Sequence, residues 1–205
     1  LSGDHPLFKE LQAMGPEGIK LLGDLLKSGD SQTRFAAAAL MEKLMDPSAL
    51  PSLTEAVFSP ENADNKLVQR MAAHAIGKIG GAEAVPTLER LMADGSEWGV
   101  RTNAAHFLAE MGHQAGIEWI RDGYADAEDD MARMALLGSM SAVGDPSYLP
   151  VLHEVLTTET EYTKRYMAMQ GIAKAARQDS LPILQGIAAD ADEDQMIVAA
   201  AKKAI

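Results

Sequence analysis

Residues Val68–Met92 read VQRMAAHAIGKIGGAEAVPTLERLM and contain a pattern that recurs through the chain. Counted from Gln69, small or apolar residues stand at positions 3, 4, 7 and 10, which is the spacing of one face of a helix. Gly80 and Gly81 then end that helix. Pro86 marks the first turn of a second helix, because the missing N–H of proline costs nothing there. These residues therefore predict two helices joined by a short turn.

The pattern repeats through most of the 205 residues. Its first position returns at intervals of 35, 32, 32 and 32 residues, on Arg34, Gln69, Arg101, Arg133 and Arg165. Seventeen residues later, four of these five units have a proline, namely Pro51, Pro86, Pro150 and Pro182, and the third unit has Glu118. Repeats of this length with two helices each stack on one another to bury a shared core.

This pattern resembles the HEAT-like repeats found in phycobilin lyases and in many bacterial HEAT-repeat scaffolds. The resemblance implies an all-α fold, a right-handed α-solenoid (superhelix) of about six HEAT-like helix pairs plus a terminal helix. We expect a single HEAT-repeat domain over residues 1–205, with the first pair as an N-terminal cap. Its units span residues 5–28, 31–60, 64–94, 97–125, 128–158 and 161–190, and the terminal helix spans 194–205.

The composition narrows the classes of ligand and partner. Apolar residues make up 47% of the chain and aromatic residues 5%, which favours a helical core. The formal net charge of −12 opposes binding to nucleic acid, whose backbone selects clustered lysine and arginine, and no apolar run is long enough for membrane insertion. The absence of cysteine suits cytoplasm and periplasm alike, and the start at Leu1 leaves a removed leader open. The oligomeric state does not follow from these counts.

The resemblance also bears on function. HEAT-like arrays are mostly scaffolds, because stacked helix pairs offer an extended concave surface and no deep pocket. We therefore expect a non-enzymatic scaffold or assembly factor that binds a partner protein, with no cofactor, catalytic residue or metal site. The alternative is a bilin lyase or lyase-like chaperone subunit, since phycobilin lyases share the repeat. A resemblance to deoxyhypusine hydroxylases fails, because the recurrent His-Glu pair by which that family binds iron occurs here once, at His153-Glu154.

The expected partner surface lies on the second helices, taken as the concave side of the array. Eighteen and twenty-one residues after each first position, the later units combine apolar side chains with acids. The predicted partner-binding residues are Thr87, Arg90, Trp119, Asp122, Val151, Glu154 and Ile183. An apolar ridge centred on Trp119 and bordered by acid fits a basic amphipathic segment of another protein. The competing interpretation places Trp119, Val151 and Ile183 in the cores of their own repeats.

Three further groups of polar residues receive structural interpretations. His74 and His106 share one position of successive repeats and are expected to be solvated, because helices packed ~10 Å apart keep two imidazoles from sharing a zinc ion. The acidic runs 126–130 and 190–194 precede helices and are expected to cap them rather than to bind calcium. The first-position arginines are expected to pair with the acids that precede them.

Overall fold

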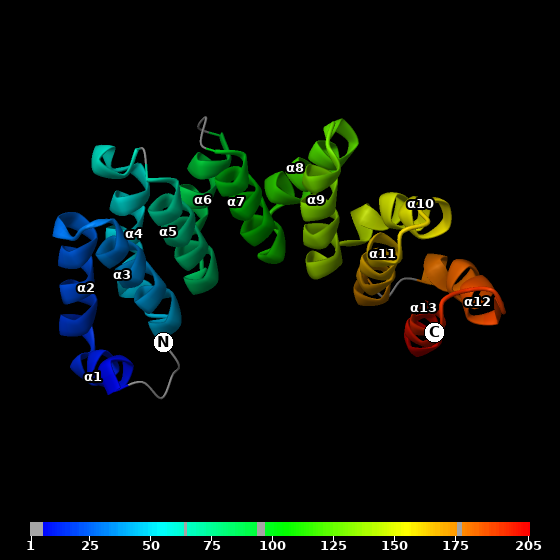
Figure 1. The fold of residues 1–205 in the computed structure, drawn as a ribbon, viewed down its shortest axis with the longest axis horizontal. Coiled ribbons are helices and arrows are strands. Elements are labelled where there is room, and N and C mark those ends of the chain that lie inside the picture. The colour runs from blue at the N-terminus through cyan, green and yellow to red at the C-terminus, as the bar shows by residue number, and fades with distance from the viewer. Residues whose placement is uncertain (1–5, 64, 94–96, 176–177) are drawn as a thin grey trace. The chain divides into compact units, whose positions relative to one another are not determined.

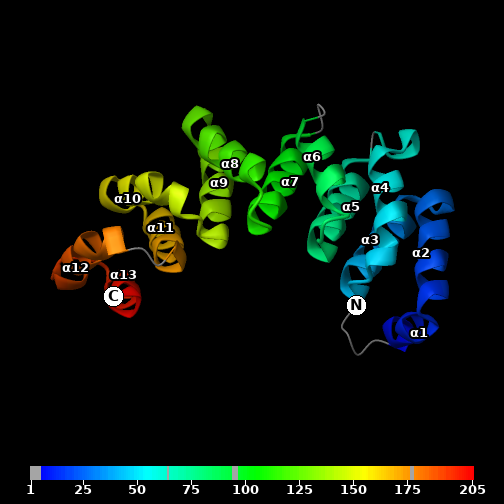
Figure 2. The ribbon, with the colours of Figure 1, turned by 180° about the vertical axis from the view of Figure 1, so that it is seen from behind.

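The structure is a computed structural model that describes residues 6–63, 65–93, 97–175 and 178–205. Throughout these ranges the chain forms helices and short loops without a strand (Figure 1). Contacts divide the chain into two compact units, Leu1–Gly116 and Ile117–Ile205. Within each unit the helices stack side by side, as the ribbon shows from both directions (Figures 1 and 2). The expected all-α solenoid is confirmed, and the expectation of a single domain stays a prediction.

The helices follow the predicted repeats in order. The first unit contains α1 (Pro6–Met14), α2 (Pro16–Ser28), α3 (Ser31–Leu44), α4 (Leu50–Phe58), α5 (Lys66–Ile79), α6 (Val85–Ala93) and α7 (Trp98–Glu110). The boundary between the units falls within α8 (Gln114–Asp126). The second unit contains α9 (Asp130–Val143), α10 (Leu149–Thr158), α11 (Tyr162–Ala175), α12 (Leu181–Ala189) and α13 (Gln195–Ala204). Among the described residues, the six expected pairs and the terminal helix are all present.

The starts of the first helices follow from a column of capping residues. Asp30, Asn65, Asp129 and Asp194 each precede such a helix and accept a hydrogen bond from a backbone N–H of its first turn. The hydrogen bond from the Thr33 backbone holds the pKa of Asp30 below its usual value, because it favours the carboxylate. Capping by the two acidic runs is thereby confirmed at Asp129 and Asp194.

The first helices end on residues with positive φ. The φ angles of Gly80, Gly112 and Gly144 are 65°, 77° and 67°, which glycine adopts without steric cost. Met45 occupies the same place after α3, in the left-handed region with φ 54°, and its side chain is exposed. Positive φ at this position is therefore shared by these repeats even where glycine is missing.

The helices of each unit lie in two layers with different spacing. In the first unit, α3 packs on α5 and α5 on α7, while the second helices α4 and α6 pack on α5 and α7 in turn. In the second unit, α11 packs on both α9 and α13, while α10 packs on α11 and α12 on α13. Within the described residues, α4 and α6 make few or no contacts with each other, and the same holds for α10 and α12.

The closely spaced layer identifies the concave side. In a curved stack of two layers, the layer with the smaller spacing lies on the inside, so the first helices line the concave side of each unit. The expectation that the second helices form that side is wrong. One physical reason lies at Gly77 of α5, where a Cβ would overlap the ring of Phe107 on α7. Small residues of this kind let neighbouring first helices approach closely.

Candidate binding surfaces

In the first unit, the two predicted partner-binding residues lie on α6 and face α4. Oγ1 of Thr87 lies 3.1 Å from Oγ1 of Thr54, and the two hydroxyls share a hydrogen bond. The guanidinium of Arg90 lies over the ring of Phe58, 3.7 Å from its centre. These side chains therefore bridge the wider spacing of the second-helix layer.

In the second unit, the predicted residues lie on three second helices. Asp122 and Glu154 are exposed, whereas the three apolar residues Trp119, Val151 and Ile183 are half-buried. Asp122 accepts a hydrogen bond from Nε of the adjacent Arg121 at 3.0 Å. The apolar residues are thus neither fully in the core, as one interpretation had it, nor on an open surface, as the partner-binding interpretation had it. Their role in partner binding stays a prediction.

A more exposed apolar surface lies near the N-terminal ends of the first helices. One large side chain per helix is exposed there, on Phe35, Leu67 and Trp98 in the first unit and on Met131, Tyr162 and Met196 in the second. We call these sets the first row and the second row. Exposed apolar residues are ordinary when single, but recurrence on neighbouring helices of one layer is typical of an interaction surface. None of these residues was among those predicted from the repeat.

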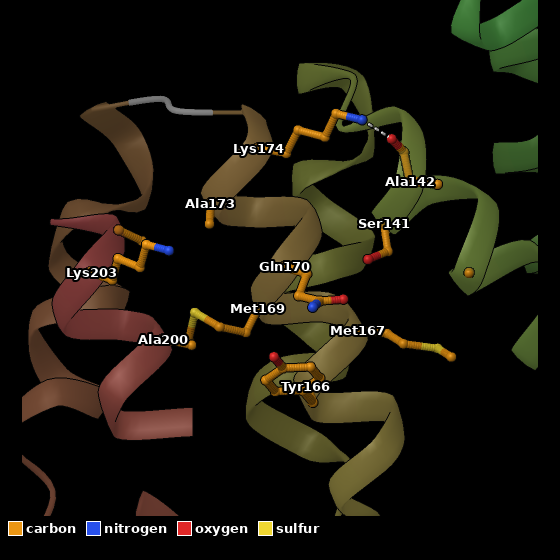
Figure 3. Close-up of a pocket in the computed structure, with 12 residues that line it drawn as sticks. Ser141, Ala142, Tyr166, Met167, Met169, Gln170, Ala173, Lys174, Ala200 and Lys203 are labelled. Carbon is orange, nitrogen blue, oxygen red and sulfur yellow. Dashed lines mark hydrogen bonds between the residues drawn. The ribbon is translucent and has the colours of Figure 1, made fainter. Parts of the chain in front are cut away.

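Grooves cross the same layer in each unit. In the first unit, a groove of about 340 Å³ is lined by Phe35, Leu67, Arg70, Met71, His74 and Asn103. In the second unit, a groove of about 710 Å³ crosses α9, α11 and α13 (Figure 3). The layer of first helices is therefore hollowed as well as apolar.

Two histidines of the first unit, His74 and His106, pack on one aromatic ring. The rings of His74 and His106 contact Phe107 edge-on, at centroid distances of 5.2 and 5.4 Å. Nε2 of His74 lies 3.6 Å from the carboxylate of Glu42, and Nε2 of His106 lies 3.6 Å from that of Glu110. Both rings are thus half-buried rather than freely solvated. Across the residues that the structure describes, no group of three His, Cys, Asp or Glu side chains could hold a metal ion.

Acidic side chains lie near Tyr162 of the second row. Three carboxylates share the ammonium group of Lys164, those of Asp130, Glu161 and Glu159, at 2.6, 3.5 and 3.9 Å. One cation for three acids leaves an excess of negative charge beside Tyr162. Burial, followed by the negative charge of Asp194, raises the pKa of Tyr162. The start of α11 is therefore both apolar and acidic.

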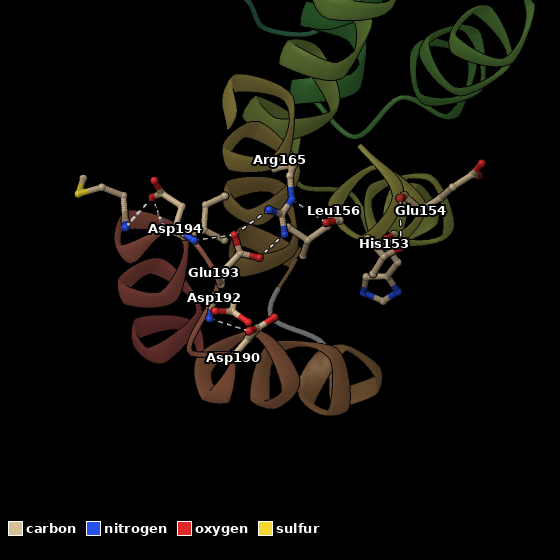
Figure 4. A network of polar contacts seen from close by, with 11 residues as sticks. His153, Glu154, Leu156, Arg165, Asp190, Asp192, Glu193 and Asp194 are labelled. Carbon is tan, nitrogen blue, oxygen red and sulfur yellow. Dashed lines mark hydrogen bonds and ion pairs between the residues drawn. The ribbon is translucent and has the colours of Figure 1, made fainter. Parts of the chain in front are cut away.

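Three of the four first-position arginines bind backbone carbonyls near the ends of second helices. Nε of Arg101 donates to the carbonyl of Met92 at 2.9 Å. In the same way, Nε of Arg133 donates to the carbonyl of Ala127 at 3.1 Å, and Nε of Arg165 donates to that of Leu156 at 3.0 Å. Arg165 also binds the carboxylate of Glu193 with both terminal nitrogens (Figure 4). Glu193 follows Arg165 in the chain, so the expectation of pairing with preceding acids is wrong for Arg165.

Comparisons with known proteins bear on the family of this chain. None of the described helices combines the length and apolar character of a membrane span. A solved structure of human deoxyhypusine hydroxylase in complex with glycerol is similar at 15% sequence identity and a TM-score of 0.45, over 99% of this chain and 91% of that chain. No curated protein matches the chain. The bilin lyase alternative stays an untested prediction, since a shared repeat identifies no chemistry. The family model for HEAT repeats matches residues 61–141 and again 96–165, together just over half of the chain, so this protein belongs to the HEAT repeat family.

Proposed function

We propose that this protein is a non-enzymatic scaffold that binds a basic amphipathic segment of a partner protein on the first-helix layer of its second unit. The observation that carries the proposal is the second row, in which Met131, Tyr162 and Met196 are 81%, 43% and 59% exposed. These side chains lie on α9, α11 and α13, which pack side by side. An amphipathic segment laid across them would remove this apolar surface from water.

The charge of the second unit indicates which kind of partner segment would bind. The second unit contains eight basic and fifteen acidic residues, a formal net charge of −7. Lys164 is shared by three carboxylates beside the second row, so the local charge is negative as well. Complementarity therefore favours lysine or arginine around the apolar anchors of the partner.

The second helices offer less apolar surface than the second row. Trp119, Val151 and Ile183 are only half-buried, but they are less exposed than any member of that row. The partner expected from the sequence is therefore kept, and its place moves from the second helices to the first.

The test uses a synthetic amphipathic helix of leucine and lysine, with binding followed by fluorescence anisotropy. The double variant Met131→Ser, Tyr162→Ser should bind this peptide at least about tenfold more weakly, because apolar anchors dominate such interfaces. Leu21→Ser is the matched control, since Leu21 is 44% exposed on α2, outside both rows, and should leave the affinity unchanged. A peptide with glutamate in place of lysine should not bind, and added salt should weaken binding of the basic peptide.

Three results would contradict the proposal. Equal binding of the acidic peptide would show that charge does not select the partner. Wild-type affinity in the double variant would show that the second row is not the binding surface. New covalent visible absorbance after incubation with a bilin and an acceptor protein would overturn the non-enzymatic assignment. Capture of a partner from the native source, compared between wild type and the double variant, extends the test to the natural ligand.

A further inference from the structure

The groove of about 710 Å³ in the second unit is made by small residues. Gly138 and Ala142 on α9, Ala173 on α11 and Ala200 on α13 contribute little side chain where the three helices meet. A Cβ built at Gly138 would meet no atom within 4 Å, so the space beside it is open. The volume falls within the range of about 300–1,000 Å³ that is typical of small-molecule sites.

The walls of the groove are mainly apolar. Tyr166, Met167 and Met169 of α11 line it, and Figure 3 shows Met169 directed toward Ala200 on α13. Methionine is flexible and polarizable, so it adapts its shape to an apolar ligand. The ring of Tyr166 stacks on that of Tyr162, with centroids 5.7 Å apart, which holds one end of the wall.

The charge of the groove is opposite to that of its surroundings. Among the twelve residues that line it, the two that carry charge are Lys174 and Lys203, and neither Asp nor Glu is among them. The unit as a whole has a formal net charge of −7. A site without acids and with two lysines, in a unit so rich in acid, selects an anion.

The two lysines have different environments. The stem of Lys174 packs over Gly144, and its ammonium group donates to the carbonyl of Ala142 at the end of α9. Lys203 makes no ion pair with a described residue, and Figure 3 shows its ammonium group directed toward Ala173 on the neighbouring helix. Lys203 is therefore the cation available to a ligand, and Lys174 adds its remaining N–H donors.

We propose that this groove binds a small amphipathic carboxylate, with its apolar chain against Met167, Met169 and Tyr166 and its carboxylate beside Lys203. This site adjoins the second row at Tyr162, but no member of that row lines it, and the inference does not depend on the proposed partner. The ligand is a free small molecule rather than a peptide.

Isothermal titration calorimetry with dodecanoate, kept below its micelle concentration, tests the proposal directly. We expect saturable binding to the full chain and no saturable binding of dodecyltrimethylammonium, which has the same alkyl chain and the opposite charge. The net charge of −12 favours the cation over the protein as a whole, so preference for the anion reports the local field of the groove. Preference for the cation, or no saturable heat with dodecanoate, would overturn the proposal.

Two pairs of variants locate the site. Lys203→Gln should weaken dodecanoate binding about fivefold, whereas Lys202→Gln should leave it unchanged, because Lys202 lines a different groove. Ala173→Leu should abolish binding by filling the groove, whereas Ala199→Leu, also exposed but outside it, should not. Circular dichroism confirms that each variant is folded. Wild-type binding in Ala173→Leu, or tighter binding of a peptide with an apolar C-terminus than of dodecanoate, would contradict the assignment.

Discussion

The guanidinium of Arg165 binds the carboxylate of Glu193 with both terminal nitrogens, across 28 residues of sequence. The side chain of Glu193 is 5% exposed and that of Arg165 is 21% exposed. Nε of Arg165 also donates to the carbonyl of Leu156, so one side chain joins the end of α10, the start of α11 and the loop before α13. Arg165 therefore holds these three segments of the second unit together.

Replacement of Arg165 should destabilise the second unit strongly. Arg165→Met leaves Glu193 buried without its cation, and breaking a buried pair in this way costs about 3 kcal/mol. Arg133→Met is the control, because Arg133 is exposed and donates to the Ala127 carbonyl, a hydrogen bond worth about 1 kcal/mol. Urea denaturation followed by circular dichroism gives both values. Equal losses in the two variants would argue against a special role for the Glu193 contact.

The residue at the end of α3 offers a stabilising substitution. Met45 has φ 54° at a place where Gly80, Gly112 and Gly144 have positive φ in other repeats. Since a side chain disfavours this conformation, Met45→Gly should raise the free energy of unfolding by about 0.5–1 kcal/mol. Gly144→Ala should have the opposite effect, because its Cβ would lie 2.6 Å from Cγ of Lys174. Thermal denaturation of both variants tests the signs.

The two glycines of α8 should respond differently to alanine. A Cβ at Gly116 would lie 2.5 Å from the carbonyl oxygen of Ala105, so Gly116→Ala forces α8 away from α7 and should destabilise the protein by about 1–3 kcal/mol. At Gly123 the nearest atom would be Cδ1 of Leu136 at 3.5 Å, an ordinary contact. Gly123→Ala should therefore stabilise the helix by up to about 1 kcal/mol. Denaturant midpoints of the two variants should move in opposite directions.

Acidification should weaken the second unit through His153. Burial lowers the pKa of His153 from its ordinary value of 6.5, although the charge of Asp179 opposes the shift, and Nε2 lies 3.1 Å from Oγ of the buried Ser180. The unfolded chain therefore takes up a proton more readily, and stability is lost as the pH falls below 6.5. His153→Gln should flatten this part of the pH profile. A profile unchanged by the substitution, measured by urea denaturation across that range, would contradict the assignment.

The helices were predictable because their signals are local. Pro150 in a first turn and Gly144 at a helix end act within a few residues, and capping by Asp129 depends on the three residues that follow. The half-burial of Trp119 was harder to predict from the sequence, since a small error in helical phase moves a side chain between core and surface. The acidic partner of Arg165 lies 28 residues away, beyond the reach of any local pattern.

The concave side and the rows were missed for different reasons. The spacing of the layers depends on tertiary contacts such as Phe107 against Gly77, which no single repeat displays. The rows did leave a signal in the sequence. Leu67, Trp98, Met131 and Tyr162 each stand two or three residues before a first position, so a search of the exposed face at helix starts would have found them.

The capping residues and the exposed rows occupy different positions of the same repeat. Asp129 starts α9 through the backbone, while Met131 projects from that helix with 81% of its surface exposed. Asp129 stabilises the start of the helix by about 1 kcal/mol, whereas the exposed side chain of Met131 packs on little of the repeat. Under the proposed function, single substitutions at these exposed positions would change the partner one repeat at a time and leave the helices of the stack unchanged.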